Sequence, residues 1–259
     1  MEINLKNKAE LVTPPGLIIF GFRGSVAHGM YIPGTDPDSI DDIDLMGVFI
    51  NPKEHYLGFS RKEDFERFEG QYDVVCYELR KFISLLMKCN PNVMSLLYLE
   101  KDHMEYTTPL GQRLIDNRDL FASKIAYNSF CGYAHSQLSR MEKSTYKGYM
   151  GSKRKELVDR YGYDCKHAAH LIRLLKMGTE FLQFGKLYVN REDRGDADEL
   201  LGVKRGKYKL KAIQEWADEL FLQINNANRF SNLPDKPDKE KIEKLLIEIL
   251  EEHFYEINK

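Results

Sequence analysis

Short runs of apolar residues indicate strands in the first third of the chain. The runs contain β-branched and aromatic side chains, and turn-forming residues separate them. They cover residues 17–22, 43–50 and 72–78. A helix is predicted at 78–89, and Pro91 opens another, because Asn90 is a suitable cap and proline is favoured at the first helical position. Residues 1–12 are compatible with an initial helix, so this part of the chain is predicted to be mixed α/β.

From about Asp119 onward, apolar residues recur at spacings of three and four, which is typical of amphipathic helices. Long helices are predicted at residues 121–141, 163–185, 208–227 and 239–256. Pro234 and Pro237 break the chain just before the last of them. We therefore expect an α+β fold, with a mixed sheet flanked by helices in residues 1–117 and an α-helical domain in residues 118–259.

The composition argues against several classes of protein. The 38 Lys and Arg residues are nearly balanced by 40 Asp and Glu residues, so a globally basic nucleic-acid binder is not indicated, although a local basic patch is compatible with this balance. No run of about 18 apolar residues is present, so no membrane span is expected. The first residues do not resemble a secretory signal, so we expect a cytoplasmic protein.

The cysteines are scattered along the chain without a Cys-x-x-Cys pair. They are Cys76, Cys89, Cys131 and Cys165. Such spacing disfavours a zinc site and favours reduced thiols in the core.

The first chemical signal follows the first predicted strand, which Gly24 and Ser25 interrupt. Glycine lets the backbone approach a ligand closely, and a helix that begins here presents free N–H groups to an anion. The Ser25 hydroxyl adds one more donor. A Gly-Ser pair alone is a weak signal, but this position is suited to holding a phosphate.

Asp42 and Asp44 stand at the beginning of the second predicted strand. Alternate side chains of a strand share a face, so the two carboxylates point the same way while Ile43 and Leu45 face the core. Adjacent carboxylates repel unless a cation lies between them, and Mg²⁺ favours carboxylate and phosphate oxygens. Two such ions about 4 Å apart can hold both the attacking and the leaving oxygen of an in-line displacement.

The loop between these two motifs is also acidic, but its Pro and Gly residues mark turns. We interpret Asp36, Asp38 and Asp41 mainly as turn formers. An EF-hand is a poor match, because the central Gly and the final Glu are missing at their positions. An isolated Asp-x-Asp is most often a solvated turn, so the functional interpretation depends on the two motifs together, one after each of two predicted strands.

A third carboxylate is needed to complete such a metal site, and the third predicted strand offers two. Asp73 begins this strand and is the preferred candidate. Glu78 has the opposite parity on an ideal strand, so both cannot face one site unless the strand ends between them. The simpler alternative is that Asp73 is an ordinary strand-entry residue.

The helix predicted at 163–185 has a polar stripe on an otherwise apolar element. The stripe consists of Tyr163, Lys166, His170 and Arg173, at offsets of three, seven and ten. Its cations suit a triphosphate or an RNA backbone, and Lys166 is the leading phosphate ligand. An ordinary solvated face is the alternative, and His167 is also compatible with a satisfied core histidine.

Two basic segments with interleaved tyrosines and glycines occur at 143–155 and 204–209. Lysines can contact phosphates and tyrosines can stack on bases, so both segments could guide an RNA end. The first is interpreted as a mobile loop that joins two helices, and solvated linkers are the simpler alternative for both.

The strand, Gly-Ser, Asp-x-Asp and later Asp together resemble the DNA polymerase β-like nucleotidyltransferase superfamily. Within it, the chain is most similar to the RNA repair pathway DNA polymerase β family of predicted nucleotidyltransferases. The closer resemblance covers about residues 17–210. It involves four further segments, at 77–82, 88–92, 163–174 and 202–206. The loop between Ser25 and Asp42 is longer than in minimal members of the superfamily, which leaves the shape of the nucleotide pocket open.

The resemblance implies a polymerase-β-like catalytic domain. In it, Gly24 and Ser25 bind the triphosphate, and Asp42 and Asp44 hold Mg²⁺ or Mn²⁺. Asp73 completes the metal site and helps to activate the acceptor hydroxyl.

The implied activity is transfer of a nucleoside monophosphate from an NTP, with ATP among the candidates, to an RNA end as part of RNA repair. Lys166, with His170 and Arg173, contacts the nucleotide. One alternative is transfer to a protein or a small molecule. Another is that the chain binds a nucleotide or RNA without catalysis. The base, the acceptor and the oligomeric state do not follow from the sequence.

Overall fold

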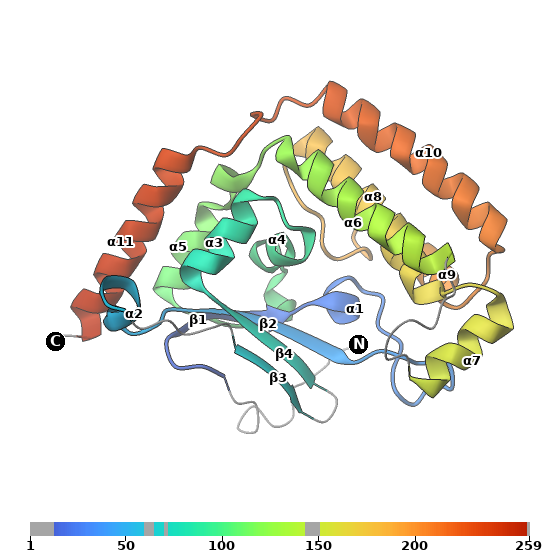
Figure 1. The fold of residues 1–259 in the computed structure, drawn as a ribbon, viewed down its shortest axis with the longest axis horizontal. Helices are drawn as coiled ribbons and strands as arrows, with labels where there is room; N and C mark the ends of the chain where they lie inside the picture. Colours follow the sequence, from blue (N-terminus) through green and yellow to red (C-terminus); the bar gives the residue numbers. More distant parts are fainter. Residues whose placement is uncertain (1–12, 60–64, 70–71, 143–150, 258–259) are drawn as a thin grey trace.

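A computed structural model of the chain describes residues 13–59, 65–69, 72–142 and 151–257. Within these residues the strands form one mixed sheet, and the helices rise from one side of it (Figure 1). The helix predicted for residues 1–12 and the first part of the basic segment 143–155 lie outside the described residues.

The sheet is built around a parallel pair of strands. The strands are β1 (Leu17–Phe22), β2 (Ile43–Phe49), β3 (Phe65–Glu69), β4 (Tyr72–Glu78) and β5 (Met104–Thr107), in the order β3-β4-β2-β1-β5. β2 and β4 are parallel, and the other neighbours are antiparallel. The register of the parallel pair sets Asp44 directly beside Asp73, near the N-terminal end of each strand.

Short helices follow the strands, and longer helices make up the second half. The first set is α1 (Gly24–Ala27), α2 (Lys53–Leu57), α3 (Leu79–Met87), α4 (Pro91–Leu97), the 3₁₀ turns η2 (Lys101–His103) and η3 (Arg118–Phe121), and α5 (Pro109–Asp116). The second set is α6 (Ile125–Glu142), α7 (Ser152–Tyr161), α8 (Cys165–Phe184), α9 (Ala197–Lys204), α10 (Leu210–Arg229) and α11 (Lys239–Ile257). Asn90 caps α4 as expected, because its side chain accepts hydrogen bonds from the backbone N–H groups of Asn92 and Val93.

The predicted strands and long helices are confirmed to within a few residues at each end, and a mixed sheet with flanking helices confirms the α+β class. The edge strands β3 and β5 were not predicted. Their sequences alternate weakly, because an edge strand is largely exposed: Glu66 and Arg67 in β3 and Tyr106 in β5 are all exposed. The loop interpretation of 143–155 is wrong for residues 152–155, which begin α7. α7 buries only Leu157 and Val158, so its sequence carries almost no apolar periodicity.

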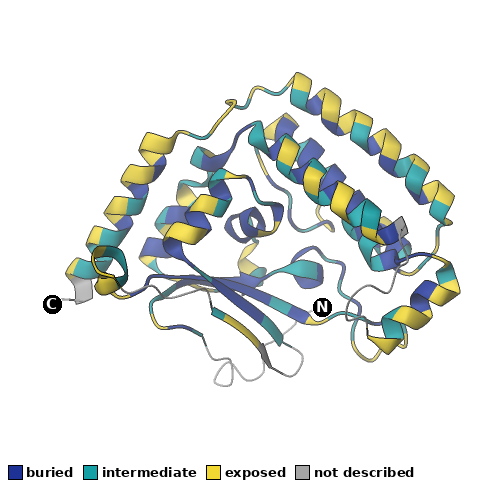
Figure 2. Ribbon diagram, viewed as in Figure 1, coloured by how far each residue is buried: buried dark blue, intermediate teal, exposed yellow. Residues whose placement is uncertain are grey.

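The core is continuous from the sheet into the long helices. Figure 2 shows the central strands buried, while the outward faces of α10 and α11 are exposed. α8 is the central helix, because it packs against α6, α9 and α10, and thirteen of its residues are buried. The buried cysteines Cys76, Cys89 and Cys165 are free thiols within this core, as predicted.

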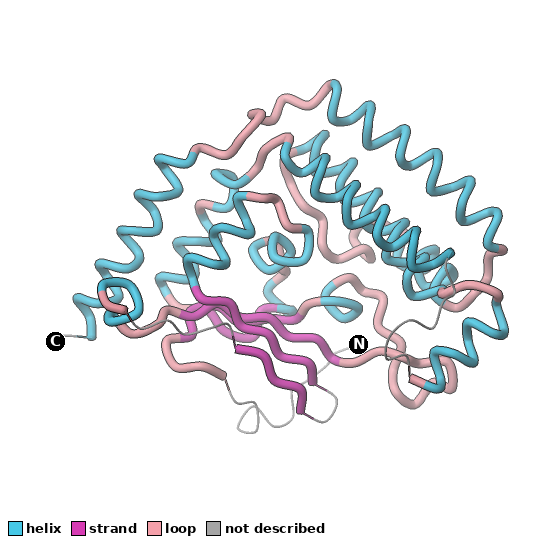
Figure 3. Tube along the Cα trace, viewed as in Figure 1, coloured by secondary structure: helices cyan, strands magenta, loops and turns pink. Residues whose placement is uncertain are grey.

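The strands lie on one side of the molecule, and α6, α8 and α10 lie on the other (Figure 3). The last helix lies against the first half of the chain, because α11 contacts α5 and η3. Arg113 of α5 pairs with Glu252 of α11 at 2.6 Å. Among the described helices, none combines the length and apolar character that a membrane span needs.

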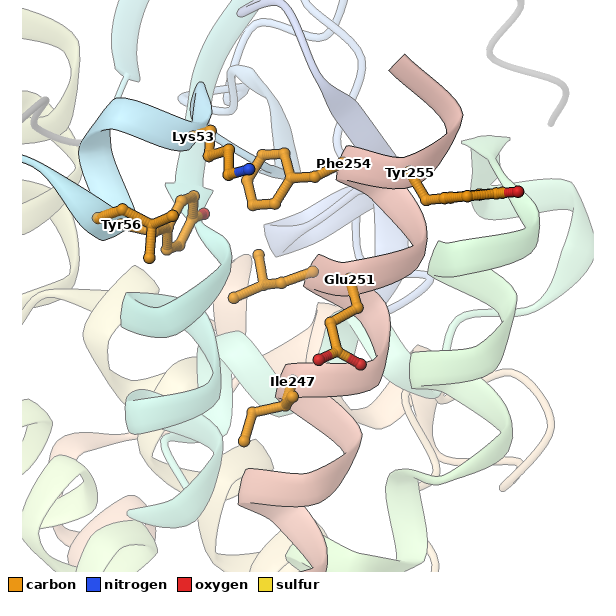
Figure 4. Close-up of a pocket in the computed structure, with 8 residues that line it drawn as sticks. Lys53, Tyr56, Ile247, Glu251, Phe254 and Tyr255 are labelled. Carbon is orange, nitrogen blue, oxygen red and sulfur yellow. The ribbon is translucent and has the colours of Figure 1, made fainter. Parts of the chain in front are cut away.

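An apolar cavity of about 470 Å³ lies where α11 meets α2 (Figure 4). The rings of Tyr56 and Phe254 meet there edge to face, with centroids 5.7 Å apart. Figure 1 shows that this end of the molecule lies away from α1 and α8, and hence from the predicted site residues.

Candidate functional site

A cavity of about 400 Å³ is lined by six of the eight predicted site residues, all except Ser25 and Asp42. One wall is formed by the turn after β1 and the N-terminal ends of β2 and β4, with Gly24, Asp44 and Asp73. The helices α4, α6 and α8 form the other wall. α8 contributes Lys166, His170 and Arg173 to this wall. Carboxylates and cations that are more than 90 residues apart in the sequence therefore face one space.

Asp44 and Asp73 are held side by side by the parallel register of their strands. Their side chains are 28% and 43% exposed. The guanidinium of Arg23 lies against both carboxylates: Nη2 donates to Asp73 Oδ2 at 2.8 Å and is 3.6 Å from Asp44 Oδ1. One cation thus lies against both carboxylates and reduces their mutual repulsion.

The charge at Asp44 is incompletely compensated. Burial raises the pKa of Asp44 to about 6, and the negative charges of Asp73 and Asp42 act in the same direction. Arg23 and Lys166 oppose the shift without cancelling it. A further positive charge at this point therefore stabilises the ionised carboxylate.

Oxygen donors with excess negative charge fit Mg²⁺ or Mn²⁺, which prefer such ligands. Within the described part of the chain, however, no three His, Cys, Asp or Glu side chains converge closely enough to enclose a metal ion. A metal here would depend on the aspartates together with oxygens of a bound ligand.

Asp42 lies one position before β2 and is exposed. Ile43 and Leu45 are buried, at 5% and 0% exposure, so the predicted alternation is confirmed. Asp42 is not part of the cavity wall, but its charge raises the pKa of Asp44, so the two carboxylates interact.

Glu78 is at the opposite end of β4 from Asp73 and has a different task. Its carboxylate accepts hydrogen bonds from the backbone N–H groups of Arg80 and Lys81, and so caps α3. The Tyr56 hydroxyl donates to the same carboxylate at 2.5 Å. Since Asp73, not Glu78, is beside Asp44, the structure favours Asp73 as the third carboxylate.

The turn after β1 is packed directly on Asp44. Gly24 has a φ of +62°, and a Cβ atom added there would lie 2.1 Å from Asp44 Oδ2. Only glycine combines this backbone conformation with such a close approach. Ser25 adjoins Gly24 at the beginning of α1 and is 8% exposed, and its Oγ accepts a hydrogen bond from Lys204 Nζ at 2.9 Å.

The three α8 residues that line the cavity are half-buried or buried, so the alternative of a solvated stripe is wrong. Arg173 is 5% exposed, and no carboxylate pairs with it in the described part of the chain. Its Nη1 contacts the Met177 sulfur instead. Burial lowers the pKa of Arg173 to about 9, and the charge of Arg191 acts in the same direction. A buried arginine without a counter-charge favours binding of an anion.

Tyr163 does not belong to this stripe. It precedes α8 and is buried, and its hydroxyl donates to the Tyr208 backbone oxygen at 2.6 Å. His167 does not line the cavity either. Its Nδ1 is 2.6 Å from Gln137 Oε1, and burial lowers its pKa to about 4, which supports the structural interpretation.

The acidic loop between Ser25 and Asp42 forms ion pairs with residues of the second half of the chain. Asp36 forms a turn as expected, since its Oδ1 accepts from the Asp38 backbone N–H, but it also pairs with Arg205. Asp38 pairs with Arg160 of α7.

The interpretation of Asp41 mainly as a turn former is wrong. Its side chain is fully buried and pairs with Lys204, and Lys166 Nζ is 3.6 Å away. The partners are more than 120 residues along the chain from Asp41, so the local sequence gives no sign of the pairing.

Several cavity residues were missed from the sequence. They are Arg23, His28, Asn92, Ser95, Tyr133, Ser136, Gln137 and Arg140. Arg23 could have been noticed, because it stands between the predicted strand and Gly24. The α6 residues occur in an ordinary amphipathic pattern, and nothing in their spacing distinguishes them from a solvated face.

Comparisons with known proteins identify the family of the chain. No curated protein matches the chain. Among solved structures, a nucleotidyltransferase-like protein from Exiguobacterium sibiricum is similar at 9% identity and a TM-score of 0.30, over 83% of this chain and 69% of that one; this likeness is too weak to carry an argument. The pattern of the RNA repair pathway DNA polymerase β family matches residues 17–248. Because this match spans most of the chain, including the aspartates and α8, the protein belongs to the RNA repair pathway DNA polymerase β family.

Proposed function

We propose that this protein is a nucleotidyltransferase that moves a nucleoside monophosphate from an NTP to a hydroxyl acceptor and releases pyrophosphate. The observation that carries the proposal is one cavity with Asp44 and Asp73 in register on one wall and the cations of α8 on the other. Carboxylates and cations facing each other suit a metal-bound triphosphate, because the reaction depends mainly on positioning and charge stabilisation.

Asp42, Asp44 and Asp73 are the residues that would hold Mg²⁺ or Mn²⁺. The metal would neutralise phosphate charge and polarise the reacting oxygens. Arg23 supplies a positive charge to Asp44 and Asp73 in the protein alone, and its guanidinium can turn towards phosphate oxygens when another cation takes that place.

The triphosphate is assigned to the space between the Gly24-Ser25 turn and α8. Arg173 supports this assignment most directly, because its buried charge has no carboxylate partner in the described part of the chain. Lys166 lines the same space, although its Nζ also donates to the Ile40 backbone oxygen at 3.2 Å. His170 completes this side of the wall, and burial keeps its pKa well below 6.5, so it acts as a neutral group.

The acceptor is assigned to an RNA end, and Asp73 is assigned to activate its hydroxyl. The family description supports RNA. Arg140 on α6 lines the cavity and can contact an RNA phosphate. Arg154 and Arg160 of α7 pair with Asp164 and Asp38, so they are less available than the basic sequence predicts.

The test incubates the protein with each labelled NTP in turn, Mg²⁺ and an RNA pool, and measures label in the RNA. Asp42→Asn and Asp44→Asn are each expected to abolish transfer while the fold stays intact. Asp38→Asn is the matched control, because this aspartate pairs with Arg160 outside the cavity and should leave transfer unchanged.

Three outcomes contradict parts of the proposal. Full activity in either Asn variant rules out the metal assignment. Label that appears in protein or in a small molecule instead of RNA moves the activity to another acceptor. NTP binding without turnover, under varied metals and with a related active enzyme as a positive control, indicates a binding protein that has lost catalysis.

A further inference from the structure

Lys204 has an unusual position for a lysine, because its ammonium group is buried beneath the phosphate turn. It ends α9, and its side chain is 2% exposed. Nζ donates to Ser25 Oγ and to the Met30 backbone oxygen, both at 2.9 Å, and to the Asp41 carboxylate. The sequence separates Lys204 from Ser25 by 179 residues, so this contact exists only in the folded protein.

The contact constrains the Ser25 hydroxyl. A hydroxyl has one hydrogen and two lone pairs, whereas an ammonium group can only donate. Lys204 therefore occupies a lone pair of Ser25 Oγ, and the hydroxyl hydrogen must point elsewhere. Among the described residues no group accepts that hydrogen, and Ser25 directly follows Gly24 of the cavity wall.

Asp41 makes the buried ammonium tolerable without competing for Ser25. It neutralises Lys204, and the Ile32 backbone N–H at 3.0 Å holds its carboxylate in place. The ammonium remains fixed on Ser25 and on the backbone just after α1. A pair buried in this way sets geometry more than it adds stability.

We propose that Lys204 is a positioning residue that orients the Ser25 hydroxyl so that it donates its hydrogen to a phosphate oxygen of the bound NTP. The inference rests on the proposed function for the identity of the ligand. Lys204 itself does not touch the nucleotide, because its buried ammonium group is already engaged by Ser25, Met30 and Asp41. Its influence on phosphate binding is therefore expected to pass through Ser25.

The test is a double-mutant cycle read out by binding of inorganic tripolyphosphate with Mg²⁺, measured by calorimetry. One arm is Ser25→Ala. The other is Asp41→Asn/Lys204→Met, which removes both charges of the pair, because removing Lys204 alone leaves an uncompensated buried carboxylate. Should this pair fail to fold, Asp41→Leu/Lys204→Met replaces it. Arg205→Met is the matched control, since Arg205 also joins the loop at Asp36 but does not contact Ser25.

Each arm is expected to weaken binding about tenfold, the effect of one lost hydrogen bond to a charged group. If Lys204 acts through Ser25, the combined variant binds no more weakly than Ser25→Ala alone. Effects that multiply to about a hundredfold, or a folded Asp41→Asn/Lys204→Met variant with unchanged binding, overturn the proposal.

The KM for the NTP should follow the same cycle in the transfer assay. The binding measurement does not need turnover. A wild-type protein that binds tripolyphosphate but transfers nothing thus contradicts the proposed function, while the cycle still decides the role of Lys204. If the wild-type protein transfers label but the effects of the two arms on tripolyphosphate binding multiply, the proposed function stands and the role of Lys204 is contradicted.

Discussion

At the scale of single residues, the site depends on how closely the β1–α1 turn packs on Asp44. Gly24 is required twice over, by its φ of +62° and by the carboxylate 2.1 Å from the place of a Cβ atom. Because the strand register sets Asp44 beside Asp73, the turn and the two carboxylates are packed together.

Gly24→Ala should therefore damage both stability and activity. The strained backbone and the clash are expected to lower the free energy of unfolding by about 1–3 kcal/mol and to abolish transfer in the remaining folded protein. Chemical denaturation and the labelled-NTP assay measure the two effects. Gly34→Ala is the matched control in the following loop, because nothing lies within 4 Å of its added Cβ atom. Equal effects at the two glycines would show that the packing on Asp44 is unimportant.

At the scale of elements, β4 carries two carboxylates with separate tasks at its two ends. Asp73 lies in the cavity wall, and Glu78 caps α3 and accepts the Tyr56 hydroxyl. This division follows from strand length, because residues five positions apart on a strand are about 16 Å apart. The sequence left the choice between them open, and the parallel register with β2 provides the geometric distinction.

Glu78→Ala should thus reduce stability, whereas Asp73→Asn should reduce activity. Loss of the cap and of the Tyr56 hydrogen bond is expected to reduce stability by about 1–3 kcal/mol, with transfer retained in the folded protein. The Asp73 side chain is half-exposed, so Asp73→Asn should change the free energy of unfolding by less than about 1 kcal/mol while transfer is lost. Denaturation midpoints beside transfer rates distinguish the two. A Glu78 variant that is stable but inactive would contradict the assignment.

At the scale of the whole molecule, the second half of the chain closes over the sheet and buries polar groups at the junction. His28 is one of them: it follows α1, is 5% exposed, and its Nδ1 is 2.9 Å from the Val189 backbone oxygen. Burial lowers its pKa well below 6.5, and the charge of Arg173 acts in the same direction. The folded protein therefore holds His28 neutral.

Acid should destabilise the protein through this histidine. Above pH 6.5 neither state binds its proton, but below that value the unfolded chain becomes protonated while the folded protein does not. Stability is thus lost as the pH falls, by up to about 2 kcal/mol for one such histidine between pH 6.5 and pH 5. Denaturation curves across this range measure the slope.

His28→Asn isolates this contribution, because the Asn amide can still donate to the Val189 oxygen but does not titrate. The variant should lose less stability than the wild type as the pH falls. His135→Asn, at an exposed position on α6, is the matched control. Identical slopes for the His28 variant and the wild type would mean that His28 binds protons equally in the folded and unfolded states.

The sequence alone determined the local parts of this protein. Strands β1, β2 and β4 and the long helices follow from apolar periodicity, and the Asn90 cap follows from its neighbours, because these signals depend on residues within one or two turns of each other. The candidate residues Gly24, Asp44 and Asp73 were also predictable, because Gly24 follows one apolar strand and the two aspartates stand near the beginnings of two others. Their catalytic roles stay predictions, as does the division of the chain at residue 117.

Only the tertiary structure decided which charges meet. The pairing of Asp41 with Lys204 and the burial of Arg173 without a carboxylate depend on how α8 and α9 close over the sheet. The position of Arg23 against Asp44 depends on the pairing of β1 with β2. A charge in a sequence looks the same whether it is solvated or buried, and burial is what gives it a large energy and therefore a specific partner. The longer loop between Ser25 and Asp42, which the sequence presented as turns, is bound to distant helices for this reason.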